Sequence, residues 1–151
     1  MDMLDELGGI YSEALSEVIS TITGIHLEPE SQENDNCLGD ITGVMILKGK
    51  EHGILSVSAR VPDVRILCSN IIGIPPEDVT DGDLDDTMCE LVNMTAGSAK
   101  LRLNDTDYMF KLTQPFVIKG KDVSLVTKSI TNVLACTLSN TEISVKLKVV
   151  Y

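Results

Sequence analysis

Four residues in the middle of the chain, Asp86, Glu90, Asn93 and Gly97, recur at spacings of three and four. On an α-helix such spacings stack side chains on one face, so these residues would form one stripe about 60° wide. A carboxylate can pair with a cation, and a carboxamide can both donate to and accept from a water molecule without ionising. These four residue types are also ordinary on a solvated helix face, so the pattern around them has to decide between a polar surface and a functional site.

The helix that would carry this stripe is predicted at residues 84–100, with the sequence LDDTMCELVNMTAGSAK. Its inward side falls within roughly a quarter turn and can cover a core. The inward residues are Leu84, Met88, Leu91, Val92, Thr95 and Ala99. Asp81 or Asp83 is expected to cap the helix, because an acidic first turn suits the positive end of the dipole. The alternative role of Asp86 is this dipole effect alone, and the alternative role of Gly97 is close packing within the chain.

Apolar periodicity predicts two further helices and a hairpin before the central helix. The first helix would run up to Gly24, and the second would begin near Pro62 and end at Gly73. Between these helices, residues 41–47 and 54–59 are rich in β-branched and aliphatic residues, which is typical of an antiparallel hairpin. Three elements are thus expected to precede the stripe.

After the central helix, β-branched and alternating residues predict a run of strands. These strands are expected at residues 108–112, 115–118, 129–138 and 142–150. A turn at 139–141 would join the last two as a hairpin. The acidic segment 28–40 is predicted to be a loop. The order of helices and strands indicates an α+β domain, with an antiparallel sheet carrying helices, and not a doubly wound fold.

The composition disfavours binding to nucleic acid or to an anionic membrane. A length of 151 residues fits a single domain spanning 1–151. The net charge of −11 and the aromatic content of 3% disfavour nucleic acid, because phosphate contacts need clustered cations and base stacking needs aromatic rings. The same charge disfavours an anionic membrane surface. No apolar stretch reaches the length of a membrane span and the N-terminus does not resemble a signal peptide, so a cytoplasmic location is expected.

The cysteines and histidines do not suggest a metal or redox site. The cysteines lie far apart, with no C-x-x-C or Cys/His pairing, and are expected to be structural thiols in a reducing compartment. They are Cys37, Cys68, Cys89 and Cys136. His26 and His52 lie near a predicted helix end and in a hairpin turn. The chain has no nucleophile elbow, Walker loop or dinucleotide fingerprint, so an enzyme with its own nucleophile, cofactor or metal is disfavoured.

The stripe resembles the signature of the CheC/CheX/FliY family of chemotaxis phosphatases. In that family an Asp or Ser, then E-x-x-N, then a downstream Pro mark each active helix. This chain has Asp86, Glu90 and Asn93, followed by M-T-A-G-S-A-K and by Pro115 a further 22 positions on. The likeness covers nearly the whole chain and is closest to CheX. CheC carries the motif twice, whereas Glu13 and Glu17 in the first helix here have no Asn three residues later.

The resemblance implies a CheC-like fold and a phosphatase that hydrolyses the aspartyl phosphate of a CheY-like response regulator. Asn93 would orient the attacking water, since hydrolysis needs a water in line with the breaking bond. Glu90 would dock to the regulator's Lys. Both must then share one helix face, as a spacing of three allows. Asp86 and Gly97 would contact the partner, with the small Gly97 allowing close approach.

The resemblance also implies that the protein has no cofactor of its own. Mg²⁺ would be supplied by the regulator, and the acidic run in this chain is interpreted as a helix start. That run is Asp81, Asp83, Asp85 and Asp86. A homodimer joined through sheet edges is implied as well, with 145–151 or 41–47 as candidate edge strands.

Two other classes of function stay open. A non-catalytic adaptor of the same fold would bind a response regulator or another chemotaxis or flagellar component without changing the lifetime of the phosphoryl group. A small-molecule-binding domain would require a deep apolar pocket.

Overall fold

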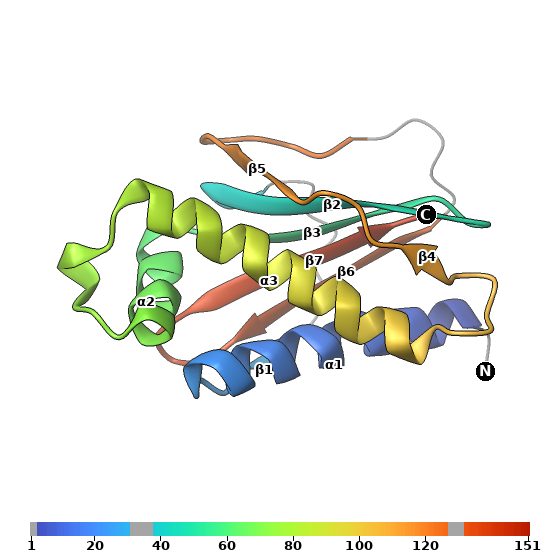
Figure 1. The fold of residues 1–151 in the computed structure, drawn as a ribbon, viewed down its shortest axis with the longest axis horizontal. Coiled ribbons are helices and arrows are strands. Elements are labelled where there is room, and N and C mark those ends of the chain that lie inside the picture. Colours follow the sequence, from blue (N-terminus) through green and yellow to red (C-terminus); the bar gives the residue numbers. More distant parts are fainter. Residues whose placement is uncertain (1–2, 31–37, 127–131) are drawn as a thin grey trace.

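A computed structural model describes residues 3–30, 38–126 and 132–151. It has the predicted α+β architecture, with a seven-stranded sheet and helices packed along one face (Figure 1). The helices are α1 (Met3–Thr23), α2 (Val61–Ile72) and α3 (Asp81–Arg102), with a 3₁₀ turn η1 (Pro76–Asp78). The strands are β1 (Glu28–Glu30), β2 (Ile41–Gly49), β3 (Gly53–Ala59), β4 (Phe110–Lys111), β5 (Phe116–Lys119), β6 (Val133–Ser139) and β7 (Ser144–Val150).

The sheet is antiparallel, in the order β1-β6-β7-β3-β2-β4, and β5 also pairs with β2. The expected hairpin is confirmed, with Ile41 opposite Ala59 and Leu47 opposite Gly53. The prediction that residues 145–151 or 41–47 form a free edge of the sheet is wrong. β7 lies between β6 and β3, and β2 lies between β3 and the β4 and β5 strands. The outer strands of the sheet are β1 on one side and β4 with β5 on the other.

The core is mainly aliphatic and lies between the sheet and the helices. α1 presents Leu7, Leu15 and Ile19 to it, and all three are fully buried. From α3, Met88 and Leu91 are fully buried as well. Periodic apolar residues thus form helices because each helix can cover the apolar face of the strands. α1 and α3 also pack against each other, so the position of α3 is set by both a helix and the sheet.

The ends of the helices are partly as predicted. Gly24 follows α1 with a positive φ of 74° and is the expected C-terminal cap, and Gly73, where α2 was predicted to end, caps that helix with a φ of 80°. The expected cap of α3 is wrong, because Thr80 and neither Asp81 nor Asp83 is the N-cap. The Thr80 side chain accepts from the Asp83 backbone N–H, and the Asp83 carboxylate accepts from the Thr80 N–H in return. This reciprocal capping box fixes the start of α3.

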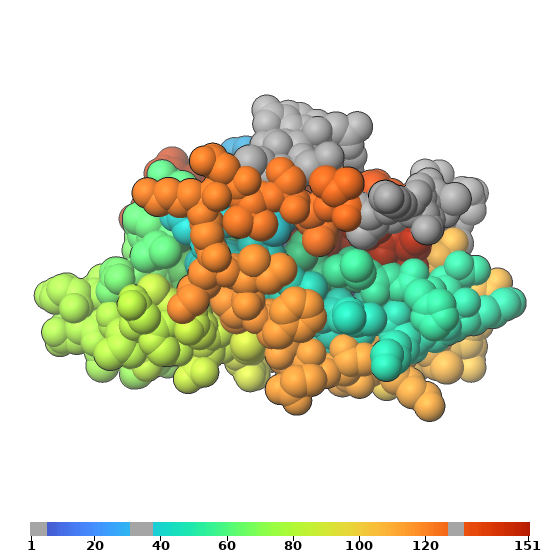
Figure 2. Space-filling view, turned by 90° about the horizontal axis from the view of Figure 1, so that it is seen from above, coloured from blue at the N-terminus to red at the C-terminus, as the bar shows by residue number. Residues whose placement is uncertain are grey.

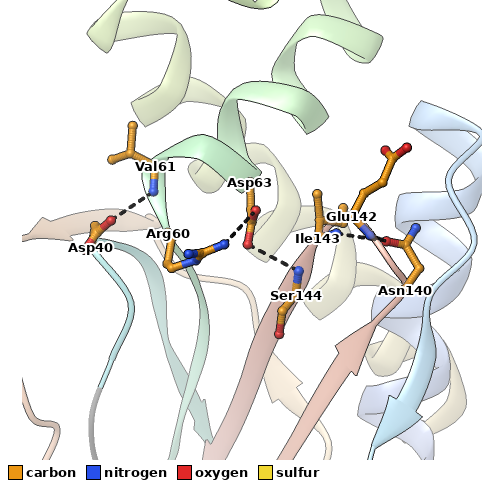
Figure 3. A network of polar contacts seen from close by, with 8 residues as sticks. All are labelled: Asp40, Arg60, Val61, Asp63, Asn140, Glu142, Ile143 and Ser144. Carbon is orange, nitrogen blue, oxygen red and sulfur yellow. Dashed lines mark hydrogen bonds and ion pairs between the residues drawn. The ribbon is translucent and has the colours of Figure 1, made fainter.

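Two aspartates connect the first turn of α2 to neighbouring strands (Figure 3). The Asp40 carboxylate accepts a hydrogen bond of 3.1 Å from the Val61 backbone N–H. Asp63, which is buried, accepts from the Ser144 backbone N–H and pairs with the Arg60 guanidinium at 3.5 Å. These contacts connect the beginning of α2 to the segment before β2 and to β7.

The predicted loop at 28–40 contains a short strand. β1 pairs with β6, with Glu28 opposite Ser139 and Glu30 opposite Thr137. The loop prediction is therefore wrong for residues 28–30, and its part at 31–37 lies outside the described residues. The strand predicted at 129–138 is found as β6, with residues 129–131 again outside the described part. The strands predicted at 108–112, 115–118 and 142–150 are found with shifted bounds.

Candidate functional site

The polar stripe lies on the solvent side of α3, as the spacing predicts. Asp86 and Glu90 are exposed, and Asn93 and Gly97 are partly exposed. All six residues predicted to face inward are buried. Within the described residues, no hydrogen bond or ion pair involves the side chains of Asp86, Glu90 or Asn93. A carboxylate and a carboxamide one turn apart are therefore available to a partner molecule.

The stripe forms one wall of an open groove of about 660 Å³. The opposite wall is the connection between β4 and β5. The groove is lined by Asp86, Cys89, Glu90, Asn93, Leu112, Thr113, Gln114 and Pro115. In the space-filling view, the orange segment that carries β4 and β5 lies directly against the yellow-green first half of α3 (Figure 2). The structure thus brings Asp86, Glu90 and Asn93 together with Pro115, but Gly97 is not among the lining residues.

The wall opposite the stripe is held in place by β2. β4 pairs with the end of β2 at Lys48 and Gly49, and β5 pairs with its beginning at residues 41–44. Between these two ladders the Thr113 hydroxyl donates a hydrogen bond of 2.7 Å to the Ile46 carbonyl oxygen. The connection is therefore fixed at both ends and near its middle.

Four residues of the groove were not anticipated from the sequence, namely Cys89, Leu112, Thr113 and Gln114. Cys89 lies within the motif itself, three residues after Asp86 on the same helix side. The other three directly precede Pro115, and the position of Pro115 in the motif was the signal that could have directed attention to them. Their place in the groove depends on strand pairing, which the spacing along α3 does not contain.

An ion pair ties the two walls together near the groove. Lys119 in β5 lies 3.1 Å from the Asp85 carboxylate in α3. Lys119 Nζ contacts Oδ2, while Oδ1 is buried and has no hydrogen-bond partner among the described residues. This pair sits one position before Asp86, so it bears on the distance between α3 and β5.

Cys89 does not supply a nucleophile to the groove. Burial raises the pKa of the Cys89 thiol, and the nearby Asp86 and Asp85 carboxylates raise it further. A thiol must be deprotonated to act as a nucleophile, and a raised pKa keeps this one protonated near neutral pH. The groove thus offers two carboxylates and neutral carboxamides, which suit the docking of a cation and the orientation of water.

Gly97 has open space around it. A Cβ atom at this position would meet no atom within 4 Å, apart from the nearby helix backbone and chain neighbours. Close packing within the chain therefore does not explain this glycine, and that alternative is excluded. A mid-helix glycine costs about 1 kcal/mol relative to alanine, so its presence at this partly exposed position calls for another reason.

The described residues contain no group of three or more His, Cys, Asp or Glu side chains arranged to hold a metal ion. The acidic run at the start of α3 is divided between different roles. Asp83 belongs to the capping box and Asp85 pairs with Lys119, while Asp86 faces the groove.

In the part of the chain that the structure describes, no helix is long and apolar enough to cross a membrane.

Comparisons with known proteins give a family match and several structural matches. The family model described as chemotaxis phosphatase CheX matches residues 41–139, which include α3 and both walls of the groove. Among curated proteins, none matches the sequence of this chain.

Solved structures share the fold over nearly the whole chain. The chemotaxis protein CheX from Vibrio vulnificus is 20% identical, with a TM-score of 0.84, and the match covers 96% of this chain and 98% of that one. A chemotaxis protein CheX from Desulfovibrio desulfuricans is 26% identical, with a TM-score of 0.80, covering 97% and 99%. CheX in a CheX-CheY-BeF₃-Mg²⁺ complex from Borrelia burgdorferi is 16% identical, with a TM-score of 0.78, covering 94% and 95%.

Proposed function

Since this chain belongs to the chemotaxis phosphatase CheX family, we propose that it accelerates hydrolysis of the aspartyl phosphate of a CheY-like response regulator. The observation that carries the proposal is the pair Glu90 and Asn93, which line one groove and whose side chains have no hydrogen bond or ion pair to any described residue. Both are placed to act on a group that enters from outside. The B. burgdorferi CheX was crystallised with CheY, which supports a regulator as that partner.

Asn93 orients the attacking water in this proposal. Its carboxamide accepts one hydrogen from the water and can donate to another oxygen, without a change of charge. The water oxygen attacks phosphorus, the bond from phosphorus to the aspartate oxygen breaks, and the aspartate leaves as a carboxylate. The released proton goes to the phosphate or to solvent. An Asn is too weak a base to remove that proton early, so the gain is one of orientation.

Glu90 docks the regulator through the regulator's Lys. Its carboxylate is exposed, lies one turn before Asn93 and has no ion-pair partner among the described residues. A carboxylate left unpaired would repel a phosphoryl group, whereas pairing with a cation removes that repulsion. The cation thus fixes the regulator so that its phosphoryl group meets the water held by Asn93.

Asp86 and Gly97 contact the same partner at the two ends of the stripe. Asp86 is exposed in the groove, one turn before Glu90. Gly97 lies one turn beyond Asn93, and the open space around it leaves room for a partner's backbone. The contact surface on α3 therefore consists of four residues, each about one helical turn from the next.

The magnesium ion belongs to the regulator and not to this chain. Asp86 and Glu90 are the carboxylates that line the groove, and Glu90 is assigned to the regulator's Lys. We further propose a homodimer joined through a sheet edge, with β1, β4 or β5 as the strand involved, because these are the outer strands. The cytoplasmic location stays a prediction from the sequence.

The test is the lifetime of the phosphoryl group on each CheY-like regulator from the same organism. The regulator is phosphorylated with a small phosphodonor, the donor is removed, and loss of the phosphoryl group is followed with and without this protein in the presence of Mg²⁺. Faster loss supports the phosphatase. Tight binding to the phosphorylated regulator with an unchanged lifetime would instead identify a non-catalytic adaptor.

A further inference from the structure

The groove contains a second carboxamide, Gln114, on the wall opposite Asn93. Its backbone is restrained on both sides. Thr113 is hydrogen-bonded to Ile46, and Pro115 has a fixed φ. The Gln114 side chain is exposed, and no hydrogen bond or ion pair among the described residues involves it. A rigid backbone thus presents a free amide group to the groove.

The charges of the groove give this amide a specific use. A phosphoryl group is anionic, while Asp86 and Glu90 are acidic, so the stripe offers it little stabilisation apart from Asn93. Of the described residues that line the groove, Asn93 and Gln114 are the two with side-chain N–H donors. The Thr113 hydroxyl already donates to Ile46. If Asn93 is occupied with the water, Gln114 is left to donate to a phosphoryl oxygen.

We propose that Gln114 is a second substrate-contacting carboxamide, which donates an N–H to a phosphoryl oxygen from the wall facing Asn93. The inference rests on the proposed phosphatase function. Positioned donors are effective where charge shifts in the transition state, because no reorganisation is needed during the reaction. Asn93 then orients the attacking water, and Gln114 binds the phosphoryl group that the water attacks.

The experiment compares Gln114→Ala and Gln114→Glu with wild type in single-turnover decay of a phosphorylated regulator. The decay rate is measured at several protein concentrations, which yields the rate at saturation and the half-saturating concentration. We expect Gln114→Ala to lower the saturating rate by about 100-fold, with the half-saturating concentration near the wild-type value. Gln114→Glu keeps the shape but replaces the donors with a negative charge, so its rate should be lower still.

Asn104→Ala is the matched control, because Asn104 is an exposed carboxamide outside the groove lining. It should behave as wild type. If Asn93→Ala abolishes acceleration while both Gln114 variants match wild type, the role of Gln114 is wrong and the phosphatase function stands. A change in half-saturating concentration alone would also overturn the role, since it would indicate a docking contact. If wild type accelerates no regulator, both proposals are wrong.

Discussion

Gly43 in β2 lies directly against the backbone of Met88 in α3. A Cβ atom at Gly43 would come within 2.5 Å of the Met88 carbonyl oxygen and 3.4 Å of the Val92 Cβ. Met88 lies between Asp86 and Glu90 in sequence, on the opposite side of the helix. The strand therefore supports α3 immediately behind the stripe, and the missing side chain sets how close the helix can approach the sheet.

Gly43→Ala should displace α3 from β2. Overpacking of this kind costs about 1–3 kcal/mol, so the free energy of unfolding in urea should fall by that amount. The rate of regulator dephosphorylation should fall as well, because Glu90 and Asn93 move with the helix. The control is Gly9→Ala, where an added Cβ meets nothing within 4 Å. Wild-type stability and rate in Gly43→Ala would show that α3 is not held by this contact.

Gly97→Ala should increase the stability of the fold and weaken binding of the regulator. Because the space around Gly97 is open, alanine should stabilise the helix by about 1 kcal/mol. If a partner's backbone approaches this position, the added methyl should also weaken regulator binding by about tenfold, which corresponds to about 1.4 kcal/mol. Urea unfolding and a direct binding titration measure the two effects.

Gly82→Ala is the comparison for this prediction. Gly82 is also helical, and its added Cβ would lie in ordinary contact with Thr80 Oγ1 at 3.8 Å. It is not among the residues that line the groove. Its substitution should leave binding unchanged. Equal binding by the Gly97 and Gly82 variants would remove Gly97 from the contact surface.

Lys119→Met should loosen the two walls of the groove. The Lys119 and Asp85 side chains are 53% and 36% exposed, so breaking their pair should cost about 1 kcal/mol or less in unfolding free energy. The effect on dephosphorylation should be larger than the effect on stability, because β5 is no longer tied to α3. Lys50→Met breaks a comparable surface pair with Asp107, at 2.9 Å, and should leave the rate unaltered. Equal rates in the two variants would argue against a positioning role.

The hydrogen-bonded pair of the buried Tyr11 and the partly buried Tyr151 should make the fold sensitive to alkaline pH. The Tyr11 and Tyr151 hydroxyls lie 2.7 Å apart. Burial raises the pKa of Tyr151 from 10.0 to about 12, and burial also raises the pKa of Tyr11 above its usual range. Between pH 10 and about pH 12 the two tyrosines lose their protons in the unfolded chain but keep them in the folded chain. Stability is therefore fully present below about pH 10 and is lost as the pH rises towards about 12.

Urea unfolding at a series of pH values from 8 to 12 checks this prediction. The free energy of unfolding should fall by up to about 1.4 kcal/mol per pH unit for each tyrosine. The double variant Tyr11→Phe with Tyr151→Phe serves as the reference, because every other ionisable side chain is the same in both proteins. A slope that is identical in the two proteins would show that the pair does not carry the effect.

The helices and the stripe could be predicted because their signals are local. Apolar residues at helical spacing in α1 and α3 reflect a single face that must be covered, and Gly24 and Gly73 mark ends where φ is positive. Glu90 and Asn93 share a face because the helix has 3.6 residues per turn. These inferences need no knowledge of which distant segments meet.

Features that depend on distant pairing could not be predicted in this way. β1 has three exposed residues and no alternation, and it is a strand because β6 lies beside it. The interior position of β7 follows from pairing with β3, some ninety residues earlier, as at Val57 and Leu147. Gln114 likewise reaches the groove because β4 and β5 both return to β2. Thr80 was missed as the N-cap of α3 because Thr80, Asp81 and Asp83 are all suitable N-cap residues and lie within four positions of one another.

The most direct measurement separates binding from hydrolysis in Asn93→Ala. Affinity is measured for a regulator carrying beryllofluoride, and decay is measured for the same regulator carrying a phosphoryl group, at saturating protein. We expect near wild-type affinity and a loss of acceleration of about 10²-fold or more, because the water is no longer oriented. Undiminished acceleration by Asn93→Ala at saturation would contradict the account.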